Sequence, residues 1–281
     1  MQRSQNDNES RIDWGIIFCV LLLALIGLAS IYVAASNDKT PTSITRQVVS
    51  QLIWYIIGTI MIIVIMQFDA EQLWKIAPIV YWLGIFLMFA ILVFYSRSYY
   101  ASTGAKSWFA IGPFTFQPSE VMKPAYILMM GRVITTHNSQ YSTHTVESDW
   151  RLIGKMLLWL MPIMISLHFQ NDFGTSLVFF AIFCGMVLVG GVTWRIIAPV
   201  ATILIVVGGS ALAMVTSTTG RRILEHIGFQ AYQFERVDTW LNPQADTTNQ
   251  GYQLWQSIKA VGSGGITGTG FNHTHVYVPV R

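Results

Sequence analysis

Apolar residues gather in long runs, separated by short polar segments, over most of this chain. Residues 1–13 are polar and mixed in charge, and the run from Trp14 to Ala35 that follows is apolar for 22 residues. A helix needs roughly 20 residues to cross a bilayer, and each run is close to that length. The pattern predicts seven transmembrane helices, at about 14–35, 48–68, 74–95, 118–135, 152–169, 174–193 and 196–216. The first run is longer than a signal-peptide core and lacks a clean cleavage site, so we expect it to be retained.

The composition changes after residue 216. Residues 217–281 contain turn dipeptides and several aromatic residues, and no run of spanning length. Four apolar residues in this region recur at helical spacing and predict an amphipathic helix at the membrane interface: Leu254, Trp255, Ile258 and Val261. The chain therefore divides into an N-terminal segment 1–13, a seven-span helical domain 14–216 and a large extramembrane region 217–281.

The overall composition excludes an ordinary soluble protein. With 53% hydrophobic and 11% charged residues, the chain is predicted to be an all-α polytopic membrane protein. Its net charge of +3 is spread over many loops, so no nucleic-acid partner is indicated. Cys19 and Cys184 lie inside apolar runs, and His273 and His275 have no third ligand nearby. We therefore expect no metal site built from these residues.

Lysine and arginine residues in short loops indicate how a multi-pass protein is oriented. With the N-terminus in the cytoplasm, the inside segments hold Arg3, Arg11, Lys75, Arg132, Arg151, Lys155 and Arg195, and the outside segments hold Lys39, Arg46, Arg97 and Lys106. This excess favours a cytoplasmic N-terminus, which places the loop 104–117, the junction 170–174 and region 217–281 on the outer face. The inside segment 136–151 is predicted to be a solvated linker carrying His137, His144, Glu147 and Asp149.

The stretch from Gly104 to Pro124 leads charged and turn-forming residues directly into an apolar run. Pro118 suits the first position of a helix, and Glu120 then falls at the third, where a carboxylate meets unpaired backbone N–H groups. Glu120 and Lys123 share one helix face, and Pro124 cannot donate to the carbonyl of Glu120. A charge in hydrocarbon costs about 2.5–3.5 kcal/mol, so these groups should face a cavity or a protein partner. A structural alternative stays open, in which Glu120 only caps the helix and Lys123 reaches the headgroups.

A second charged position lies in the short junction between two predicted spans, His168 to Gly174. Asp172 can cap the second helix by accepting from its first N–H groups, with Gly174 easing the turn. Capping is one interpretation. A carboxylate at the outer surface can also line a polar cavity.

An ordered set of motifs extends over the chain: Gly104-Ala105, Trp108, Gly112-Pro113, Gln117-Pro118-Ser119-Glu120, Lys123, Gln170, Asp172-Phe173-Gly174-Thr175, Tyr232-Gln233, Arg236, Leu241-Asn242-Pro243, Gly251-Tyr252-Gln253, Gln256-Ser257 and the glycines between Gly262 and Gly270. This set resembles the SEDS family, that of RodA, FtsW and SpoVE, and is closer to the RodA-like elongation branch. The resemblance implies a ten-span protein of the bacterial cytoplasmic membrane. It also implies a peptidoglycan glycosyltransferase that polymerises lipid II, the undecaprenyl-diphosphate-linked precursor, into glycan strands for cell elongation and shape. The implied partners are a class B penicillin-binding protein and other membrane proteins of the elongation complex.

The resemblance also implies roles for particular residues. Lys123 and Arg236 would provide positive charge for the lipid diphosphate, and Glu120 would position Lys123. Asp172 would line or cap the cavity, and three further residues would lie in it: Trp108, Gln117 and Ser119. Glycosyl transfer needs a carboxylate to take the proton of the attacking sugar hydroxyl, and cations to hold the departing diphosphate. A divalent cation, Mg²⁺ or Mn²⁺, is compatible with this chemistry, although no residue pattern indicates one.

Two positions depart from the family pattern. Asn171 stands where the family usually has Pro, which we expect to loosen that turn. In the family, a catalytic Asp follows a Pro-containing stretch after the glycine-rich loop, and here Val278-Pro279-Val280-Arg281 is the last stretch present. None of the 14 acidic residues occupies the catalytic position. The general base and three further spans are therefore expected beyond Arg281, and the polypeptide 1–281 alone is expected to be inactive.

Two other function classes stay open. A lipid II flippase or transporter would also line a cavity with charges, but it would favour polar groups near mid-bilayer and related halves, and no internal repeat is visible. A non-catalytic membrane scaffold of the cell-wall machinery would bind the same partner without making polymer.

Overall fold

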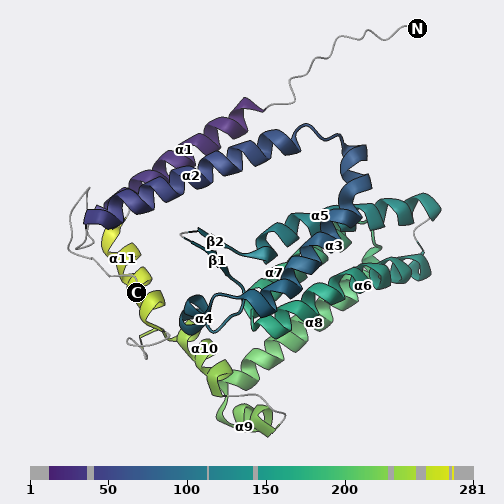
Figure 1. The fold of residues 1–281 in the computed structure, drawn as a ribbon. Coiled ribbons are helices and arrows are strands. Elements are labelled where there is room, and N and C mark those ends of the chain that lie inside the picture. The colour runs from purple at the N-terminus through teal and green to yellow at the C-terminus, as the bar shows by residue number, and fades with distance from the viewer. Residues whose placement is uncertain are drawn as a thin grey trace. The chain divides into compact units, whose positions relative to one another are not determined.

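The protein is helical, apart from one short hairpin, in the part that the computed structural model describes: residues 13–36, 41–112, 114–141, 145–226, 231–244, 251–265 and 268 (Figure 1). Its elements are, in order, α1 (Trp14–Ser36), α2 (Pro41–Ile65), α3 (Ala70–Phe94), α4 (Arg97–Thr103), β1 (Phe109–Ile111), β2 (Phe114–Phe116), α5 (Pro118–Gln140), α6 (Val146–Gln170), α7 (Phe173–Val189), α8 (Trp194–Thr216), α9 (Thr218–His226), α10 (Ala231–Leu241) and α11 (Gly251–Gly264). They form two compact units, one of Met66–Ser210 and one of Met1–Ile65 with Ala211–Arg281.

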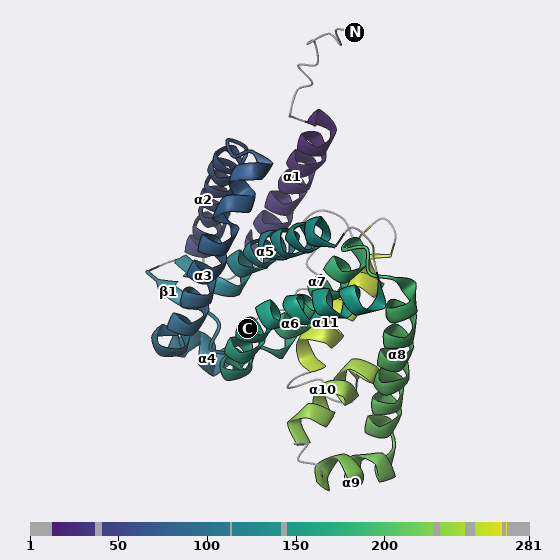
Figure 2. The ribbon, with the colours of Figure 1, turned by 90° about the vertical axis from the view of Figure 1, so that its right-hand side faces the viewer.

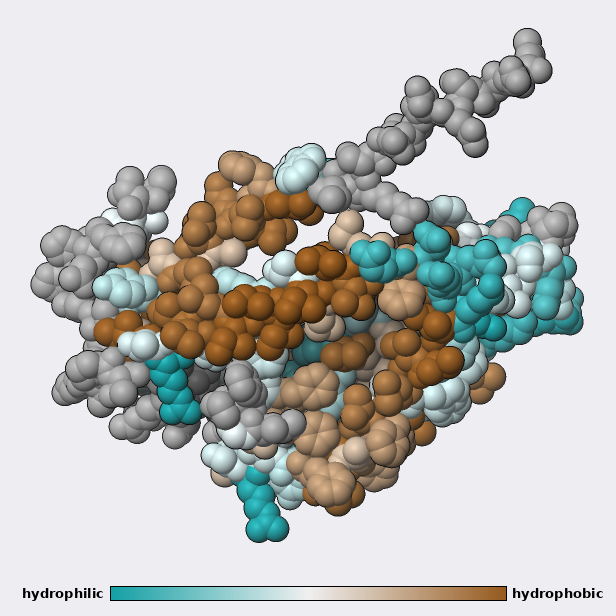
Figure 3. All heavy atoms as spheres, turned by 45° about the horizontal axis from the view of Figure 1, so that its top comes forward, coloured by the Kyte–Doolittle hydropathy of each residue, from teal (hydrophilic) through white to brown (hydrophobic). Residues whose placement is uncertain are grey.

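Five helices in the described part are long and apolar enough to cross a membrane: α1, α2, α3, α6 and α8. The other two predicted spans are present as helices. However, α5 is not among those five, and α7 is apolar but has only 17 residues. The space-filling view shows apolar side chains on the outside of the helices (Figure 3). The chain is therefore a multi-pass membrane protein, with five of the seven predicted spans supported by length and composition.

The core of the unit Met66–Ser210 lies between α3, α5, α6 and α7. Its fully buried residues include Met88, Met122, Met130 and Met156, flexible side chains that fill irregular gaps between helices. The helices α3 and α5 approach closely at Gly84, where an added Cβ would lie 2.4 Å from the sulfur of Met122. The start of α5 and the end of α6, which carry polar residues, both adjoin this core.

A proline inside α3 explains one of the contacts between α3 and α5. Pro78 has no N–H, so it cannot donate to the carbonyl of Trp74 one turn earlier. The guanidinium of Arg132, on α5, donates to that carbonyl from Nη1 at 2.7 Å, and its Cζ lies 3.9 Å from the centroid of the Trp74 ring. The backbone carbonyl that Pro78 leaves without its helical partner thus accepts a hydrogen bond from an arginine of a neighbouring helix.

The prediction of a solvated linker at 136–151 is wrong for two of its four residues. The helix α5 continues to Gln140 and α6 begins at Val146, so His137 and Asp149 lie in helices and are 1% and 0% exposed. His137 Nε2 is 3.0 Å from Ser148 Oγ, and Asp149 Oδ2 accepts from the backbone N–H of Thr193 at 2.9 Å. These polar groups are buried because they join α5, α6 and the turn before α8. His144 lies outside the described residues, and Glu147 is exposed.

The region after residue 216 contains further helices. Figure 2 shows α9 directly following α8, and the predicted amphipathic helix is present as α11. Trp255 is partly buried on α11, and Ile258 and Val261 are 45% and 77% exposed. The location of α11 at a membrane interface stays a prediction. His273 and His275 lie outside the described residues.

Candidate functional site

The first turn of α5 has the predicted arrangement. Gln117 is the N-cap residue in an extended conformation, Pro118 is the first helical residue, and Glu120 is in the first turn. Lys123 Nζ donates to both carboxylate oxygens of Glu120, at 2.7 and 2.8 Å. The Lys123 side chain is 24% exposed and that of Glu120 is 56% exposed, so the pair is open on the carboxylate side. The helix thus begins with an ion pair whose lysine is partly shielded.

The turn between α6 and α7 is short because Asp172 takes part in the end of α6 and also caps α7. Asn171 adopts the left-handed conformation, with φ of 58°, and its N–H donates to His168 O at 3.1 Å. The N–H of Asp172 donates to Leu167 O at 3.2 Å, which completes a Schellman motif at the end of α6. Asp172 Oδ1 also accepts from the N–H of Thr175 at 3.1 Å and caps α7.

This geometry confirms the predicted cap and changes two details. Gly174 lies inside α7 rather than in the turn, and the residue with positive φ is Asn171. Asparagine tolerates that conformation better than most residues. Since two backbone hydrogen bonds close the turn, it is well defined with Asn171 in place, and the expected loosening is not visible in its hydrogen bonding.

The loop before α5 attaches to the same turn at both of its ends. The N–H of Lys106 donates to Gln170 O at 2.8 Å, and Gln117 Nε2 donates to Asp172 Oδ2 at 3.3 Å. Between these two points lies a hairpin in which β1 and β2 pair antiparallel, with Phe109 opposite Phe116. The structure therefore brings Gln117 and Asp172, two predicted site residues 55 positions apart, into contact.

Sequence reasoning missed both the hairpin within the loop and the short helix α4 that precedes the loop. The hairpin signal was available, because Gly112-Pro113 separates two short apolar runs. Gly112 has a φ of 61°, a conformation that glycine adopts without strain.

Gln170 is a buried residue whose part in this arrangement was also missed. It is 1% exposed, and its Nε2 donates to Met88 O at 3.1 Å and to Ser166 Oγ at 2.9 Å. Ser166 Oγ in turn donates to Met88 O at 2.8 Å. Gln170 therefore ties the end of α6 to α3, while its own carbonyl holds the loop at Lys106.

The other predicted residues differ in exposure. Trp108 is partly buried and stacks on Tyr99, with ring centroids 5.9 Å apart, and its carbonyl accepts from the N–H of Ser96. Ser119 is 1% exposed, and its Oγ has no hydrogen-bond partner among the described residues. The part of Ser119 in a substrate cavity therefore stays a prediction.

Arg236 belongs to the other compact unit. Its backbone lies in α10, and its side chain lies outside the part that the structure describes. The predicted grouping of Arg236 with the α5 residues therefore stays a prediction.

The starts of α5 and α7 carry two carboxylates, those of Glu120 and Asp172, and one amine, that of Lys123. Glu120 and Lys123 form one pair and Gln117 and Asp172 form the other, both at the start of a helix. Such groups can bind hydroxyls through the carboxylates and an anion through the amine, since helix N-termini also favour negative charge. In the described part of the chain, no group of three or more His, Cys, Asp and Glu residues is placed to hold a metal ion.

Comparison with known proteins gives a consistent result. A family model for FtsW, RodA and SpoVE, described as "Cell cycle protein", matches residues 13–281. The putative peptidoglycan glycosyltransferase FtsW of Mesostigma viride is 30% identical over 82% of this chain and 50% of its own length. The peptidoglycan glycosyltransferase RodA of Treponema pallidum is 25% identical over 93% of this chain and 71% of its own length. This chain thus spans about half the length of the first relative.

Solved structures agree with the helical arrangement. A chain in the structure of a peptidoglycan synthase complex, described as coordinating polymerization and crosslinking, matches 92% of this chain over 67% of its own length, with 26% identity and a TM-score of 0.63. The RodA protein of Thermus thermophilus matches 76% of this chain and 64% of its own, with 25% identity and a TM-score of 0.54.

Proposed function

This chain belongs to the SEDS family of FtsW, RodA and SpoVE proteins, and we propose that it acts in the polymerisation of lipid II into peptidoglycan glycan strands. The reaction takes place at the outer face of the bacterial cytoplasmic membrane, with the N-terminus in the cytoplasm. A class B penicillin-binding protein and other elongation-complex membrane proteins are the proposed partners. The relatives named as peptidoglycan glycosyltransferases and the similar synthase complex support this assignment.

The observation that carries the proposal is the attachment of the loop Lys106–Gln117 to the α6–α7 turn at both ends. Gln117, which contacts Asp172, is the N-cap residue of α5, and the Glu120–Lys123 pair lies at the start of that same helix. Ionised groups inside a membrane are costly and mark functional positions, and Glu120 and Lys123 belong to a helix that is predicted to span it. A shared polar surface of this kind suits a substrate with a diphosphate and sugar hydroxyls.

Each residue has a proposed role in glycosyl transfer. Lys123 stabilises the negative charge that builds up on the departing lipid diphosphate, and Glu120 holds the amine in place through its two hydrogen bonds. Asp172 lines the substrate surface and accepts a hydrogen bond from Gln117. Arg236 supplies a second cation, and Trp108 and Gln117 border the substrate.

The proton of the attacking sugar hydroxyl needs a base, and this proposal assigns none of the described residues to that role.

The role of Lys123 is tested by lipid II polymerisation with the partner protein. We expect Lys123→Gln to lower polymerisation roughly 100-fold or more, the scale of losing one preorganised group that stabilises developing charge. Lys155→Gln is the matched control, because Lys155 is an exposed lysine of α6. Equal rates for both variants would refute the assignment of Lys123. Translocation of lipid II across vesicles without any polymer would support a transporter instead.

A further inference from the structure

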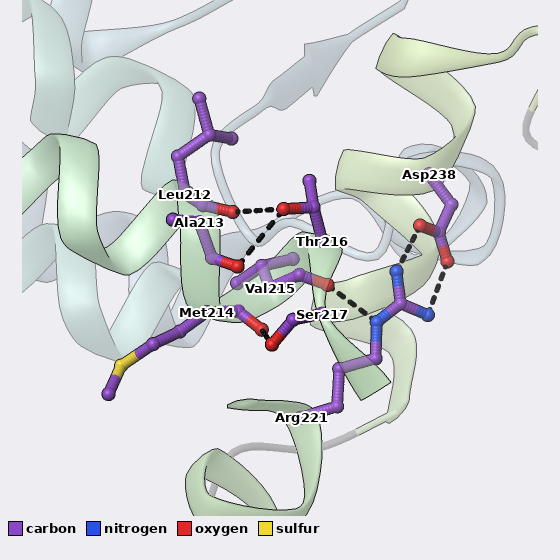
Figure 4. Close-up of polar contacts among 8 residues, drawn as sticks. All are labelled: Leu212, Ala213, Met214, Val215, Thr216, Ser217, Arg221 and Asp238. Atoms are coloured by element: carbon purple, nitrogen blue, oxygen red, sulfur yellow. Dashed lines mark hydrogen bonds and ion pairs between the residues drawn. The ribbon is translucent and has the colours of Figure 1, made fainter. Parts of the chain in front are cut away.

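Side chains donate hydrogen bonds to several backbone carbonyls at the end of α8, as Figure 4 shows. The last carbonyls of a helix have no partner within it. Here Thr216 Oγ1 donates to Leu212 O and Ala213 O at 3.1 and 3.0 Å, and the N–H of Ser217 donates to Met214 O at 3.2 Å. The next carbonyl, that of Val215, accepts from Nε of Arg221 at 2.5 Å.

Arg221 lies on α9, and its remaining N–H groups point to α10. Nη1 donates to Asp238 Oδ2 at 2.9 Å, and Nη2 donates to Asp238 Oδ1, so the contact is bidentate (Figure 4). Its Cζ also lies 5.7 Å from the ring centroid of Phe234, a residue of α10 that is 4% exposed. The hydrogen bond to Asp238 raises the pKa of the Arg221 guanidinium, which stays charged at any physiological pH. One side chain thus joins α8, α9 and α10.

The position of Arg236 follows from this attachment. Phe234 and Asp238 are four residues apart and share one face of α10. Position 236 lies between them in the sequence, and at 3.6 residues per turn it falls on the opposite side of the helix axis. The face of α10 held by Arg221 is therefore not the face that carries Arg236.

We infer that Arg221 is a positioning residue that fixes α10 to the end of α8 and so sets where Arg236 is presented. The inference rests on the proposed function in one respect, since Arg236 is there assigned to the diphosphate. A guanidinium suits the task because its planar fork can bind a carboxylate with two N–H groups while Nε remains for a carbonyl. A lysine at this position offers one amine in place of that fixed fork.

The attachment is tested by a distance measurement that does not depend on activity. Spin labels are placed at Met214 and Trp240, which are 39% and 66% exposed, in the protein with Cys19 and Cys184 replaced, reconstituted in lipid nanodiscs. Double electron–electron resonance should give a narrow distance distribution, which broadens or shifts in Arg221→Gln and in Arg221→Lys. Arg222→Gln is the matched control, because it removes the same charge from the neighbouring, exposed position.

The same variants are then assayed for lipid II polymerisation with the partner protein. We expect kcat/KM to fall roughly 10- to 100-fold in both Arg221 variants, as for misplacement of a binding group by about an ångström, and to stay unchanged in Arg222→Gln. An unchanged distance distribution in Arg221→Gln would overturn the inference. A narrow distribution kept in Arg221→Lys would do so too, because charge alone would then suffice. If the distribution broadens while activity is unchanged, Arg221 fixes α10 but the role proposed for Arg236 is wrong.

Discussion

Replacing Asp172 separates a helix cap from a functional carboxylate, the two interpretations that the sequence leaves open. Asp172→Ala removes the acceptor for the N–H of Thr175, a loss of about 1 kcal/mol for a typical N-cap. It also removes the acceptor for Gln117 Nε2, a 3.3 Å contact worth about 0.5 kcal/mol at the weak end of protein hydrogen bonds. Together these lower the free energy of unfolding by about 1.5 kcal/mol, or roughly 3–6 °C in Tm.

Asp172→Asn should behave differently. Asparagine caps helices about as well as aspartate, so the cap is kept and the interaction of the charge with the helix dipole is lost, about 0.3–1 kcal/mol. The hydrogen bond from Gln117 Nε2 is lost as well, because the amide has one oxygen in place of two. If the carboxylate charge is needed at the substrate surface, polymerisation falls at least about tenfold although the protein stays folded, since one tenfold step corresponds to about 1.4 kcal/mol. The measurements are thermal unfolding of the purified protein and lipid II polymerisation with its partner.

Thr145→Ala is the matched control for this experiment. Thr145 caps α6 by accepting from the N–H of Ser148 at 3.2 Å, at the other end of that helix from Asp172. Its loss should lower Tm by a similar amount and leave polymerisation unchanged. Full activity in Asp172→Asn would show that Asp172 is only a cap, and wild-type stability in Asp172→Ala would refute the capping energetics.

Two further predictions concern stability and are measured by thermal unfolding. Gln170→Leu loses two buried hydrogen bonds, about 1–2 kcal/mol in total, and should lower Tm by roughly 2–8 °C. Gln140→Leu, at the exposed end of α5, is the control and should have little effect on Tm. Equal Tm values for the two variants would contradict the role of Gln170. Gly220→Ala places a Cβ 2.3 Å from Met214 O and should lower Tm by several degrees, because α9 must be displaced to make room. Gly208→Ala is the control, since its Cβ would meet nothing within 4 Å and should not lower Tm. A wild-type Tm for Gly220→Ala would show that the α8–α9 connection can shift freely.

Local chemistry explains what could be predicted from the sequence. Pro118 and Glu120 mark the start of α5 by properties that depend only on neighbouring residues, and the Glu120–Lys123 pair follows from helical spacing. Asp172 was predicted as a cap for the same reason. The long apolar runs predicted the helices, with ends that differ from the observed ones by up to seven residues.

Non-local contacts explain what could not be predicted. Asp149 is buried because Thr193, 44 positions later, donates to it, and no local pattern indicates that partner. Gln170 looked like a loop residue, but Met88 on α3 gives it a buried acceptor. For the same reason the contact between Gln117 and Asp172 could be expected only from the family resemblance and the predicted loop sidedness.

The residue shared by α6 and α7 restricts how these helices can move. Asp172 belongs to the closing motif of one helix and caps the other, so no slack chain separates them. A translation of α7 along its own axis would break both sets of hydrogen bonds, whereas a change of tilt about the turn can preserve them. Rearrangements during a reaction cycle should therefore pivot at Asn171–Asp172, which would turn the first residues of α7 without carrying them away from Gln117.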